Sequence, residues 1–183
     1  LAIVAATEHK AVLASAHAVV SLGGEERVIP VGRNGLLDLD TLTDVLADGP
    51  AVVSVMWVNN ETGVVQPVPE IADRCAAAGV PFHSDVVQAF GRIPTPLGGT
   101  AVTMATISGH KLGAPKGIGA LIVRGSASLS PIIHGGGQQR EIRPGTENIA
   151  GAVGLARAAV LAVTEQAQET RRLTGLRDEL LAA

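Results

Sequence analysis

Lys111 lies in a short polar segment between two apolar runs, which is an unusual place for a lysine. The runs, residues 101–107 and 118–123, have the continuous apolar character of buried strands. Glycine and proline mark the segment between them as a loop. Lys111 is therefore either a solvated loop residue or an amine held ready for carbonyl chemistry, because burial disfavours the ammonium form and leaves a nucleophile.

Lys111 and Asp85 together suggest two kinds of site. A lysine and a carboxylate that face each other form a plain ion pair, which is common and contributes little. The same pair is also what pyridoxal phosphate requires, because the lysine forms a Schiff base and an aspartate keeps the pyridine nitrogen protonated. Ser108 and His110 beside the lysine would then bind phosphate, and His9 would stack on the flat ring. The residues alone leave both readings open.

Strands and helices alternate along the chain, which predicts an α/β fold. Continuous apolar runs predict strands, and these imply a mainly parallel (mixed) sheet with helices on both faces. Helices are expected from Thr7 or Glu8 to about residue 22, from Asp38 or Asp40 to about residue 48, over residues 67–78, and from residue 147 to about residue 180. We expect residues 1–150 to form one large domain and residues 151–183 a long helix leading out of it.

Polar clusters follow four of the predicted strands. Each cluster comes directly after its strand: Thr7 to His9 after residues 1–5, Asn59 to Glu61 after residues 51–58, Asp85 and Gln88 after residues 80–84, and Ser108, His110 and Lys111 after residues 101–107. In parallel sheets, ligands bind beyond the carboxyl ends of the strands. The four clusters should therefore converge at one edge of the sheet.

Composition excludes several classes of function. Aromatic residues make up 2% of the chain and its net charge is −3, so it offers neither stacking platforms nor a phosphate-backbone footprint for nucleic acid. The apolar runs are too short for a membrane span. One cysteine allows no internal disulfide and favours a reducing, cytoplasmic location. The scattered histidines fit no zinc-binding spacing, so no metal is expected.

Five motifs, in order along nearly the whole chain, resemble those of the cysteine desulfurases of the NifS/IscS type. These enzymes belong to the class V aminotransferase group of fold-type I pyridoxal phosphate enzymes. The matching segments are Thr7-Glu8-His9, Asn59-Asn60-Glu61-Thr62-Gly63, His83-Ser84-Asp85-Val86-Val87-Gln88-Ala89, Ser108-Gly109-His110-Lys111 with its Gly-Pro-Lys-Gly continuation, and residues 134–148, which contain Arg143-Pro144-Gly145-Thr146. The resemblance implies most of a large, cofactor-binding domain.

The resemblance assigns a role to each matching residue. Lys111 would be the Schiff-base lysine, which also moves the proton at the substrate α-carbon. The other assignments are ring and phosphate contacts, with one substrate contact: Asp85 at the pyridinium nitrogen, Gln88 at the ring 3-oxygen, His9 stacked on the ring and acting as acid or base, Ser108 and His110 at the phosphate, and Asn60 at the substrate. Thr146 would reach the phosphate of a neighbouring subunit, which implies a homodimer with shared sites.

Each of these residues also has a structural alternative. His9 could only cap its helix, Asn60 could only serve its turn, and Gln88 could be a surface amide. Thr146 could be the N-cap of the helix that begins at Glu147. His83 and His134 are expected to be structural.

Two residues mark limits to the resemblance. Cys75 lies in the body of a predicted helix, so we expect a structural role, whereas the family's sulfur-accepting cysteine lies on a mobile loop after the residues present here. Glu141 stands where relatives usually have glycine, and it would be strained if that position needs a positive φ.

The combined expectation is a piece of a cysteine desulfurase, because the chain begins at Leu1 and ends in a helical pattern. The parent enzyme would convert L-cysteine to L-alanine and pass sulfur as a persulfide to an acceptor or scaffold protein, for iron–sulfur cluster assembly or thio-modification. These 183 residues alone are expected to be inactive. The alternatives are another class V enzyme, such as a selenocysteine lyase or an aminotransferase, and a non-catalytic scaffold member.

Overall fold

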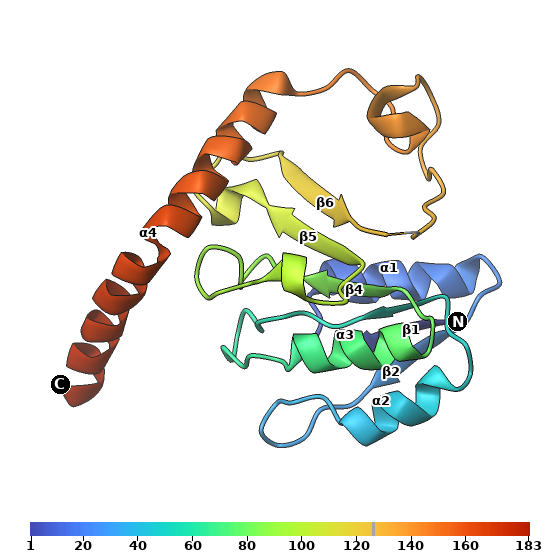
Figure 1. Cartoon of the computed structure of the whole chain (residues 1–183), viewed down its shortest axis with the longest axis horizontal. Coiled ribbons are helices and arrows are strands. Elements are labelled where there is room, and N and C mark those ends of the chain that lie inside the picture. Colours follow the sequence, from blue (N-terminus) through green and yellow to red (C-terminus); the bar gives the residue numbers. More distant parts are fainter. Residues whose placement is uncertain (126) are drawn as a thin grey trace.

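A computed structural model describes residues 1–125 and 127–183, and within them one six-stranded sheet organises the chain (Figure 1). The strand order is β2-β1-β3-β4-β5-β6. The strands are β1 (Ala2–Ala5), β2 (Glu26–Ile29), β3 (Val52–Ser54), β4 (Phe82–Asp85), β5 (Met104–Ser108) and β6 (Gly119–Val123). The first five are mutually parallel, and β6 runs antiparallel to β5. The predicted mixed, mainly parallel sheet is confirmed.

Four α-helices accompany the sheet in the described residues. They are α1 (Lys10–Ser21), α2 (Leu39–Leu46), α3 (Val68–Ala77) and α4 (Ile149–Ala182). Side chains of β1 alternate between the two faces. Ile3 and Ala5 join the buried cluster that contains residues of α2 and α3, whereas Ala2 and Val4 are buried outside that cluster, on the side where α1 contacts β1 and β2. Helices therefore cover both faces.

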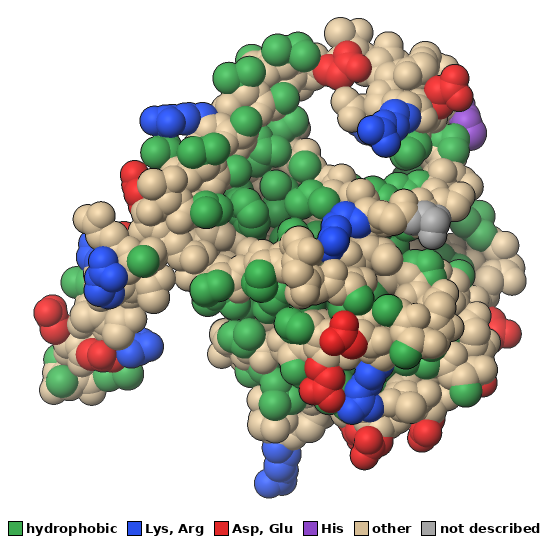
Figure 2. All heavy atoms as spheres, in the orientation of Figure 1, with side chains coloured by type: hydrophobic (Ala, Val, Ile, Leu, Met, Phe, Trp, Pro, Cys, Tyr) green, Lys and Arg blue, Asp and Glu red, His purple; other side chains and the backbone are tan. Residues whose placement is uncertain are grey.

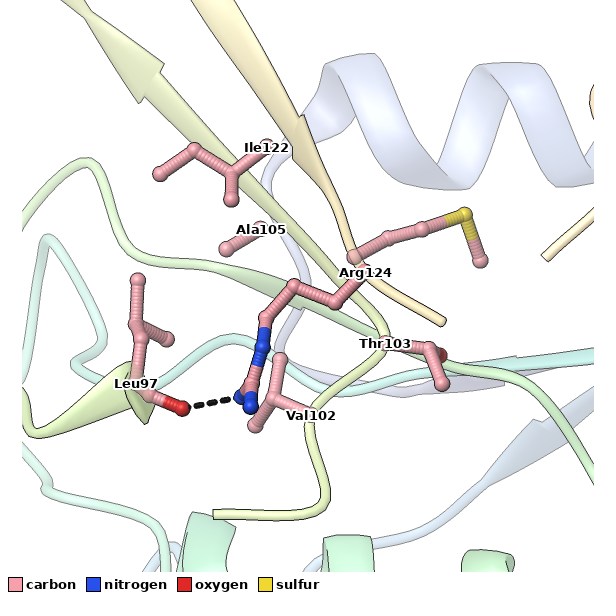
Figure 3. A pocket seen from close by; sticks show the side chains of 7 residues that line it. Leu97, Val102, Thr103, Ala105, Ile122 and Arg124 are labelled. Atoms are coloured by element: carbon pink, nitrogen blue, oxygen red, sulfur yellow. Dashed lines mark hydrogen bonds between the residues drawn. The ribbon is translucent and has the colours of Figure 1, made fainter. Parts of the chain in front are cut away.

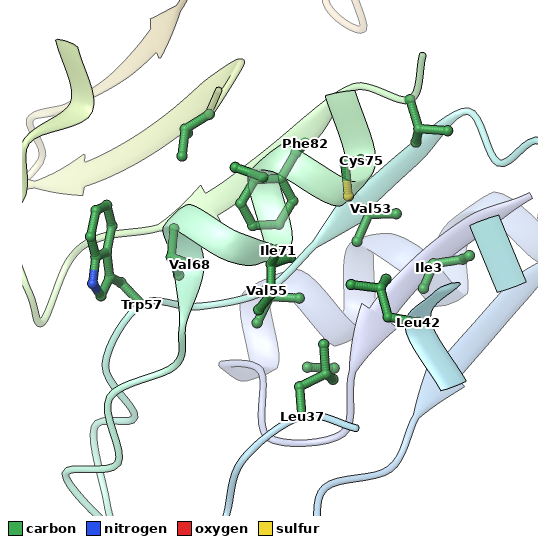
Figure 4. Close-up of a cluster of buried hydrophobic side chains, with 14 of the residues drawn as sticks. Ile3, Leu37, Leu42, Val53, Val55, Trp57, Val68, Ile71, Cys75 and Phe82 are labelled. Carbon is green, nitrogen blue, oxygen red and sulfur yellow. The ribbon is translucent and has the colours of Figure 1, made fainter. Parts of the chain in front are cut away.

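The main core is mostly aliphatic, as the low aromatic content requires. Val53, Phe82 and Ile71 are fully buried and bring together β3, β4 and α3 (Figure 4). Trp57 lies at one end of this cluster, close to the carboxyl edge of the sheet. The core thus fixes the strands whose ends carry the polar clusters.

β3 is shorter than the apolar run of residues 51–58 predicts. It pairs with β1 only as far as Ser54. Beyond that point the chain still bonds to its other neighbour, because Val55 N donates to the His83 carbonyl (3.1 Å) and Trp57 N to the Asp85 carbonyl (2.9 Å). The apolar run continues because these residues stay buried after regular pairing on both sides has ended.

Two predicted helix starts are wrong by about two residues. α1 begins at Lys10 with His9 as its N-cap, because the Glu8 side chain turns inward and accepts a hydrogen bond from Met56 N instead. α4 begins at Ile149, where the Asn148 side chain accepts from Gly151 N (2.9 Å), so Thr146 is not the cap. Of the two candidate caps of α2, Asp38 and Asp40, the structure has Asp38 as the N-cap.

α4 is one continuous helix of 34 residues. Near its middle, Gln166 donates to the Ile93 carbonyl (2.8 Å) and Thr170 to the Arg92 carbonyl (3.2 Å). Apolar side chains along it are exposed, including Val153, Leu180 and Leu181, and Figure 2 shows hydrophobic groups scattered along this arm. By length and composition alone α4 could cross a membrane, a criterion that core helices of water-soluble proteins also meet. The division at residue 150 and the absence of a membrane span stay predictions.

Candidate cofactor site at the carboxyl edge of the sheet

The ends of four parallel strands lie side by side and are joined by hydrogen bonds. Asn59 Nδ2 donates to the Thr7 carbonyl (3.0 Å), which ties the turn after β1 to the turn after β3. Asp85 is paired with Thr106 across β4 and β5. Val86 N then donates to the Thr106 carbonyl (3.1 Å). The four polar clusters therefore share one edge, as the parallel order predicts.

Lys111 ends a single 3-10 turn, Gly109–Lys111, that follows β5 directly. The Ser108 hydroxyl and His110 Nδ1 lie 2.9 Å apart across this turn, so the two predicted phosphate ligands are adjacent. Gly109 is buried, and a Cβ there would come within 2.8 Å of the Ile118 side chain and 2.9 Å of its carbonyl oxygen. Only glycine fits, and this close approach leaves Lys111 on the exposed side of the turn.

Arg92 holds the lysine turn from the neighbouring loop. Its guanidinium donates to the Lys111 carbonyl (2.9 Å) and to the Val87 carbonyl (3.3 Å). The loop that contains Gln88 and the turn that contains Lys111 are thereby fixed to one another. The role of Arg92 could not be predicted, because nothing in the sequence pattern around it distinguishes it from a solvated surface arginine.

Asp85 is the last residue of β4, and its carboxylate is half-buried. Oδ1 accepts a hydrogen bond from Val87 N (2.9 Å), which sets the direction of the carboxylate. The turn continues with Ala89 N donating to the Val86 carbonyl (3.0 Å). Gln88 therefore sits, half-buried, on the same turn as Asp85.

His9 acts as the helix cap that its sequence position allowed. Nδ1 accepts a hydrogen bond from Ala11 N (3.2 Å), and the residue is otherwise exposed. Capping occupies one ring nitrogen and leaves the ring faces available, so stacking on a cofactor stays a prediction that this geometry permits.

Asn59 and Asn60 have different environments in the loop after β3. Asn59 is buried, and its Oδ1 accepts from the backbone N–H groups of Glu61 (2.9 Å) and Thr62 (2.8 Å). Turn chemistry therefore falls to Asn59, whereas the side chain of Asn60 is exposed at the edge. Its predicted substrate contact is thus sterically open.

Glu8 is a buried carboxyl group beneath this edge, with 6% of its surface exposed. Burial is the main cause that raises its pKa to about 7, and the negative charge of Asp85 adds to the effect. The hydrogen bond from Met56 N and the nearby Ser54 hydroxyl oppose the rise. Glu8 Oε2 and Thr7 Oγ1 are both buried without a hydrogen-bond partner among the described residues. The sequence had given Glu8 no role beyond a helix start and a shared motif.

His83 is held between two hydroxyl groups, which supports the structural role expected for it. Nδ1 lies 2.7 Å from Ser54 Oγ, and Nε2 lies 3.3 Å from Thr106 Oγ1. Burial lowers the pKa of His83, and the charge of Asp85 only partly offsets this. The imidazole is therefore neutral at neutral pH.

Thr146 lies on the glycine-rich segment before α4, and no hydrogen bond among the described residues joins it to the Lys111 turn. In this segment Gln139, Arg140 and Glu141 all have positive φ, at 48°, 59° and 65°. The strain expected at Glu141 is confirmed, since non-glycine residues rarely adopt this region. The segment curls around a hollow of about 240 Å³, lined by Pro131, Ile133, His134, Gly135, Gly136, Gly137 and Glu141.

Cys75 is fully buried in α3, which supports the structural role expected for it (Figure 4). Burial raises the pKa of its thiol to about 12.

A hollow lies at the opposite end of β5, between Leu97 and Ile122, and leaves no room for a water molecule. Arg124 closes it by donating to the Leu97 carbonyl (Figure 3). In residues 1–125 and 127–183 no group of three His, Cys, Asp or Glu side chains is placed to hold a metal ion.

The residues at the carboxyl edge fit pyridoxal phosphate as a donor set. They provide an exposed amine at Lys111, a carboxylate with one oxygen fixed at Asp85, and a hydroxyl–imidazole pair 2.9 Å apart beside the amine. All of them come from neighbouring strand ends. Their individual roles stay predictions.

The chain is similar to proteins of one family throughout its length. The family described as Aminotransferase class-V matches residues 1–181. The cysteine desulfurase IscS of Rickettsia africae is 44% identical over 177 residues, which are 96% of this chain and 43% of that protein. The cysteine desulfurase NifS of Azotobacter vinelandii is 43% identical over 175 residues, 96% of this chain and 44% of that protein. The chain thus spans less than half the length of these relatives.

Solved structures share the fold. The crystal structure of DndA from Streptomyces lividans superposes with a TM-score of 0.92 at 40% identity, and covers 99% of this chain and 52% of that one. The predicted α/β class and its cofactor-binding topology are therefore confirmed by structure as well as by sequence.

Proposed function

The chain belongs to the aminotransferase class-V family, whose members depend on pyridoxal phosphate, and from this we propose that it forms the cofactor-binding part of a cysteine desulfurase. The parent reaction converts L-cysteine to L-alanine and leaves the sulfur on an enzyme cysteine as a persulfide. The observation that carries the proposal is the placement of Lys111 on the turn that directly follows β5, the strand that pairs with β4, which ends at Asp85.

Five residues hold the cofactor in this proposal. Pyridoxal phosphate, when bound, supplies an electron sink for the pair of electrons released at the substrate α-carbon. The Lys111 amine anchors it covalently, and Asp85 keeps the proton on the ring nitrogen. Ser108 and His110, whose hydroxyl and Nδ1 lie 2.9 Å apart, would donate to the phosphate. Gln88, on the Asp85 turn, hydrogen-bonds the ring 3-oxygen.

The remaining residues act on the substrate. His9 covers one face of the ring and exchanges protons with the substrate through the ring nitrogen that does not cap α1. Asn60 orients the amino acid from its exposed position in the loop after β3. With the cofactor and substrate bound, the Lys111 amine would move the proton at the substrate α-carbon.

These 183 residues bind the cofactor but do not desulfurate cysteine. The reaction needs a thiolate that attacks the substrate sulfur, and Cys75, the single cysteine, is buried with a raised pKa. We expect the accepting thiolate to come from outside this chain. We also propose a homodimer in which Thr146 reaches the phosphate bound by the partner subunit. The sulfur would pass to an acceptor or scaffold protein for iron–sulfur cluster assembly or thio-modification. We place the protein in the cytoplasm.

An absorbance spectrum tests cofactor attachment. After incubation with excess pyridoxal phosphate, the protein should show the visible band of the lysine-bound cofactor, and Lys111→Ala should abolish it. Lys116→Ala is the matched control, because Lys116 is an exposed lysine in the same loop and should leave the band intact. If Lys111→Ala keeps a band equal to that of Lys116→Ala, Lys111 is not the anchor and the proposal fails.

Products then distinguish the alternatives in the full-length protein. Alanine and sulfide from L-cysteine identify a desulfurase. Reaction with selenocysteine alone identifies a selenocysteine lyase, and a keto acid identifies an aminotransferase. Absence of both the band and any product identifies a scaffold member.

A further inference from the structure

α4 contacts the rest of the described chain along one stripe of its surface. Buried or half-buried residues recur at helical spacing in its first half, and they include Gly151, Gly154, Leu155, Ala158, Ala162 and Gln166. The turns after Thr170 are mostly exposed and extend away from the sheet (Figure 1). The stripe therefore marks the part of the helix that is packed against other elements.

Gly154 on this stripe lies against Pro115, four residues after Lys111. A Cβ on Gly154 would come within 2.9 Å of Pro115 Cδ and 3.3 Å of its Cγ. Non-bonded carbon atoms pack at ~3.5–4.0 Å, and the rigid proline ring cannot turn away. Only glycine allows this approach, so the helix contacts the loop that begins at Lys111 at close range.

Gly91, in the loop after β4, lies between α4 and the lysine turn. A Cβ on Gly91 would meet Ala162 Cβ of α4 at 2.6 Å and Leu112 Cδ2 at 3.5 Å. Leu112 directly follows Lys111 and closes its turn, because Leu112 N donates to the Gly109 carbonyl (2.9 Å). The helix and the lysine turn therefore pack on the same backbone position.

Hydrogen bonds fix the two residues after this glycine to α4. Gln166 Nε2 donates to the Ile93 carbonyl (2.8 Å), and Thr170 Oγ1 donates to the Arg92 carbonyl (3.2 Å). The Arg92 guanidinium donates in turn to the Lys111 carbonyl (2.9 Å). One residue, Arg92, is thus held by α4 and holds the lysine.

We propose that α4 positions the Lys111 amine, through Pro115 on one side and through the segment around Arg92 on the other. The inference rests on the proposed function, because it explains how the amine is held where the cofactor aldehyde can meet it. Ser108 is held separately, since its backbone pairs with Gly119 in the sheet. α4 therefore acts on the attachment of the cofactor more than on the contacts to its phosphate.

Two pairs of identical substitutions on α4 test the inference. Gly154→Ala places a methyl group 2.9 Å from Pro115, so the loop must move by about 0.6 Å or more to reach van der Waals separation. Gly175→Ala is its control, because a Cβ at Gly175 meets no atom within 4 Å. Gln166→Leu removes the hydrogen bond to the neighbouring loop, and Gln168→Leu changes an exposed glutamine on the same helix.

Amide hydrogen exchange without cofactor measures the lysine turn directly, since the N–H groups of Leu112 and Ala114 both donate to the Gly109 carbonyl (2.9 and 3.0 Å). Gly154→Ala and Gln166→Leu should each speed exchange of these two amides at least ~10-fold and leave the amides of β1 unchanged, because the opening is local. Both controls should keep wild-type rates. Wild-type rates at the two amides, or equal acceleration in β1, would overturn the inference. Gln166→Leu decides if Gly154→Ala does not fold.

Two forms of the cofactor separate the position of the amine from general damage to the site. Pyridoxal phosphate binds with a covalent bond to Lys111, whereas pyridoxamine phosphate has an amine in place of the aldehyde and binds without that bond. Gly154→Ala and Gln166→Leu should weaken binding of pyridoxal phosphate at least ~10-fold and of pyridoxamine phosphate less than ~3-fold. Equal loss of both forms, or loss of neither, contradicts the inference.

The same measurements distinguish this inference from the proposed function. If the turn exchanges as expected but the wild type binds neither form of the cofactor, the function fails and the coupling of α4 to the turn stands. If the wild type binds pyridoxal phosphate through Lys111 and the variants match it in exchange and affinity, the inference fails and the function stands.

Discussion

Cys75 should be almost unreactive in the folded protein, although the proposed reaction depends on a reactive thiolate. Burial raises the pKa of the thiol from 9.0 to about 12. At pH ~8 a tenth of an ordinary thiol with that starting pKa is thiolate, against roughly one part in ten thousand at the higher pKa. The population of the attacking form therefore falls about 1,000-fold, and forming it in place costs on the order of 4 kcal/mol. Full burial in α3 also excludes the electrophile.

Alkylation with iodoacetamide, followed by mass spectrometry of the intact chain, measures this directly. The native protein at pH ~8 should react at least ~1,000-fold more slowly than the same protein unfolded in urea. Cys75→Ala should bind pyridoxal phosphate as well as the wild type does and should fold, at a cost in stability of ~1 kcal/mol from the small cavity. A native rate within ~10-fold of the unfolded rate would show that the thiol is accessible and ionised. In that case Cys75 would again be a candidate for the sulfur acceptor.

Three further predictions concern stability and the lysine turn. Burial raises the pKa of Glu8 from 4.5 to about 7, so the wild type should lose on the order of 3 kcal/mol in free energy of unfolding, relative to Glu8→Gln, as the pH rises through this window. Urea unfolding of both proteins at pH ~5 and pH ~8 measures this difference, and the two would not diverge if Glu8 were solvated. Asp38→Ala should cost ~1 kcal/mol in urea unfolding because it removes the cap of α2, whereas Asp44→Ala on the same helix should cost less; equal losses would refute capping. Arg92→Ala should weaken pyridoxal phosphate binding ~10-fold, measured by titration of the cofactor absorbance, because the Lys111 turn loses its hydrogen bond from Arg92. Arg33→Ala changes an exposed arginine and should leave binding unchanged. Identical affinities of the two variants would show that the Lys111 turn does not need Arg92.

Features that depend on local pattern could be predicted from the sequence. Continuous apolar runs gave strands in the right places, and the parallel order then required Asp85 and Lys111 to lie at the same edge. A cap at Asp38 or Asp40 followed from polar side chains just before a helical pattern, and the structure has Asp38 as the cap. The left-handed backbone at Glu141 was foreseen as a strain because relatives usually have glycine there.

Features that depend on a distant partner could not be predicted. An acid in the first turn of a helix is a normal sequence signal, so Glu8 was placed in α1. Its true partner, Met56 N, is 48 residues further along the chain and becomes available only because β3 stops pairing with β1 at Ser54. Arg92 likewise reaches the Lys111 carbonyl 19 residues away. In both cases the partner is distant in the sequence, so no local pattern indicates the contact.

The contrast between neighbouring residues shows how this edge is built. Asn59 is buried and holds its turn while Asn60 is exposed, and Glu8 is buried and holds Met56 N while His9 is exposed. In each pair the buried member makes the long-range or turn-forming hydrogen bonds, and this frees the exposed member to face a ligand. Arg92 differs from these buried residues, because it is exposed and still holds the Lys111 carbonyl. A substitution at a buried member such as Glu8, or at Arg92, should therefore disturb the site without removing any group that touches the cofactor, which is why Glu8→Ala and Arg92→Ala are more informative about its construction than changes to Lys111 itself.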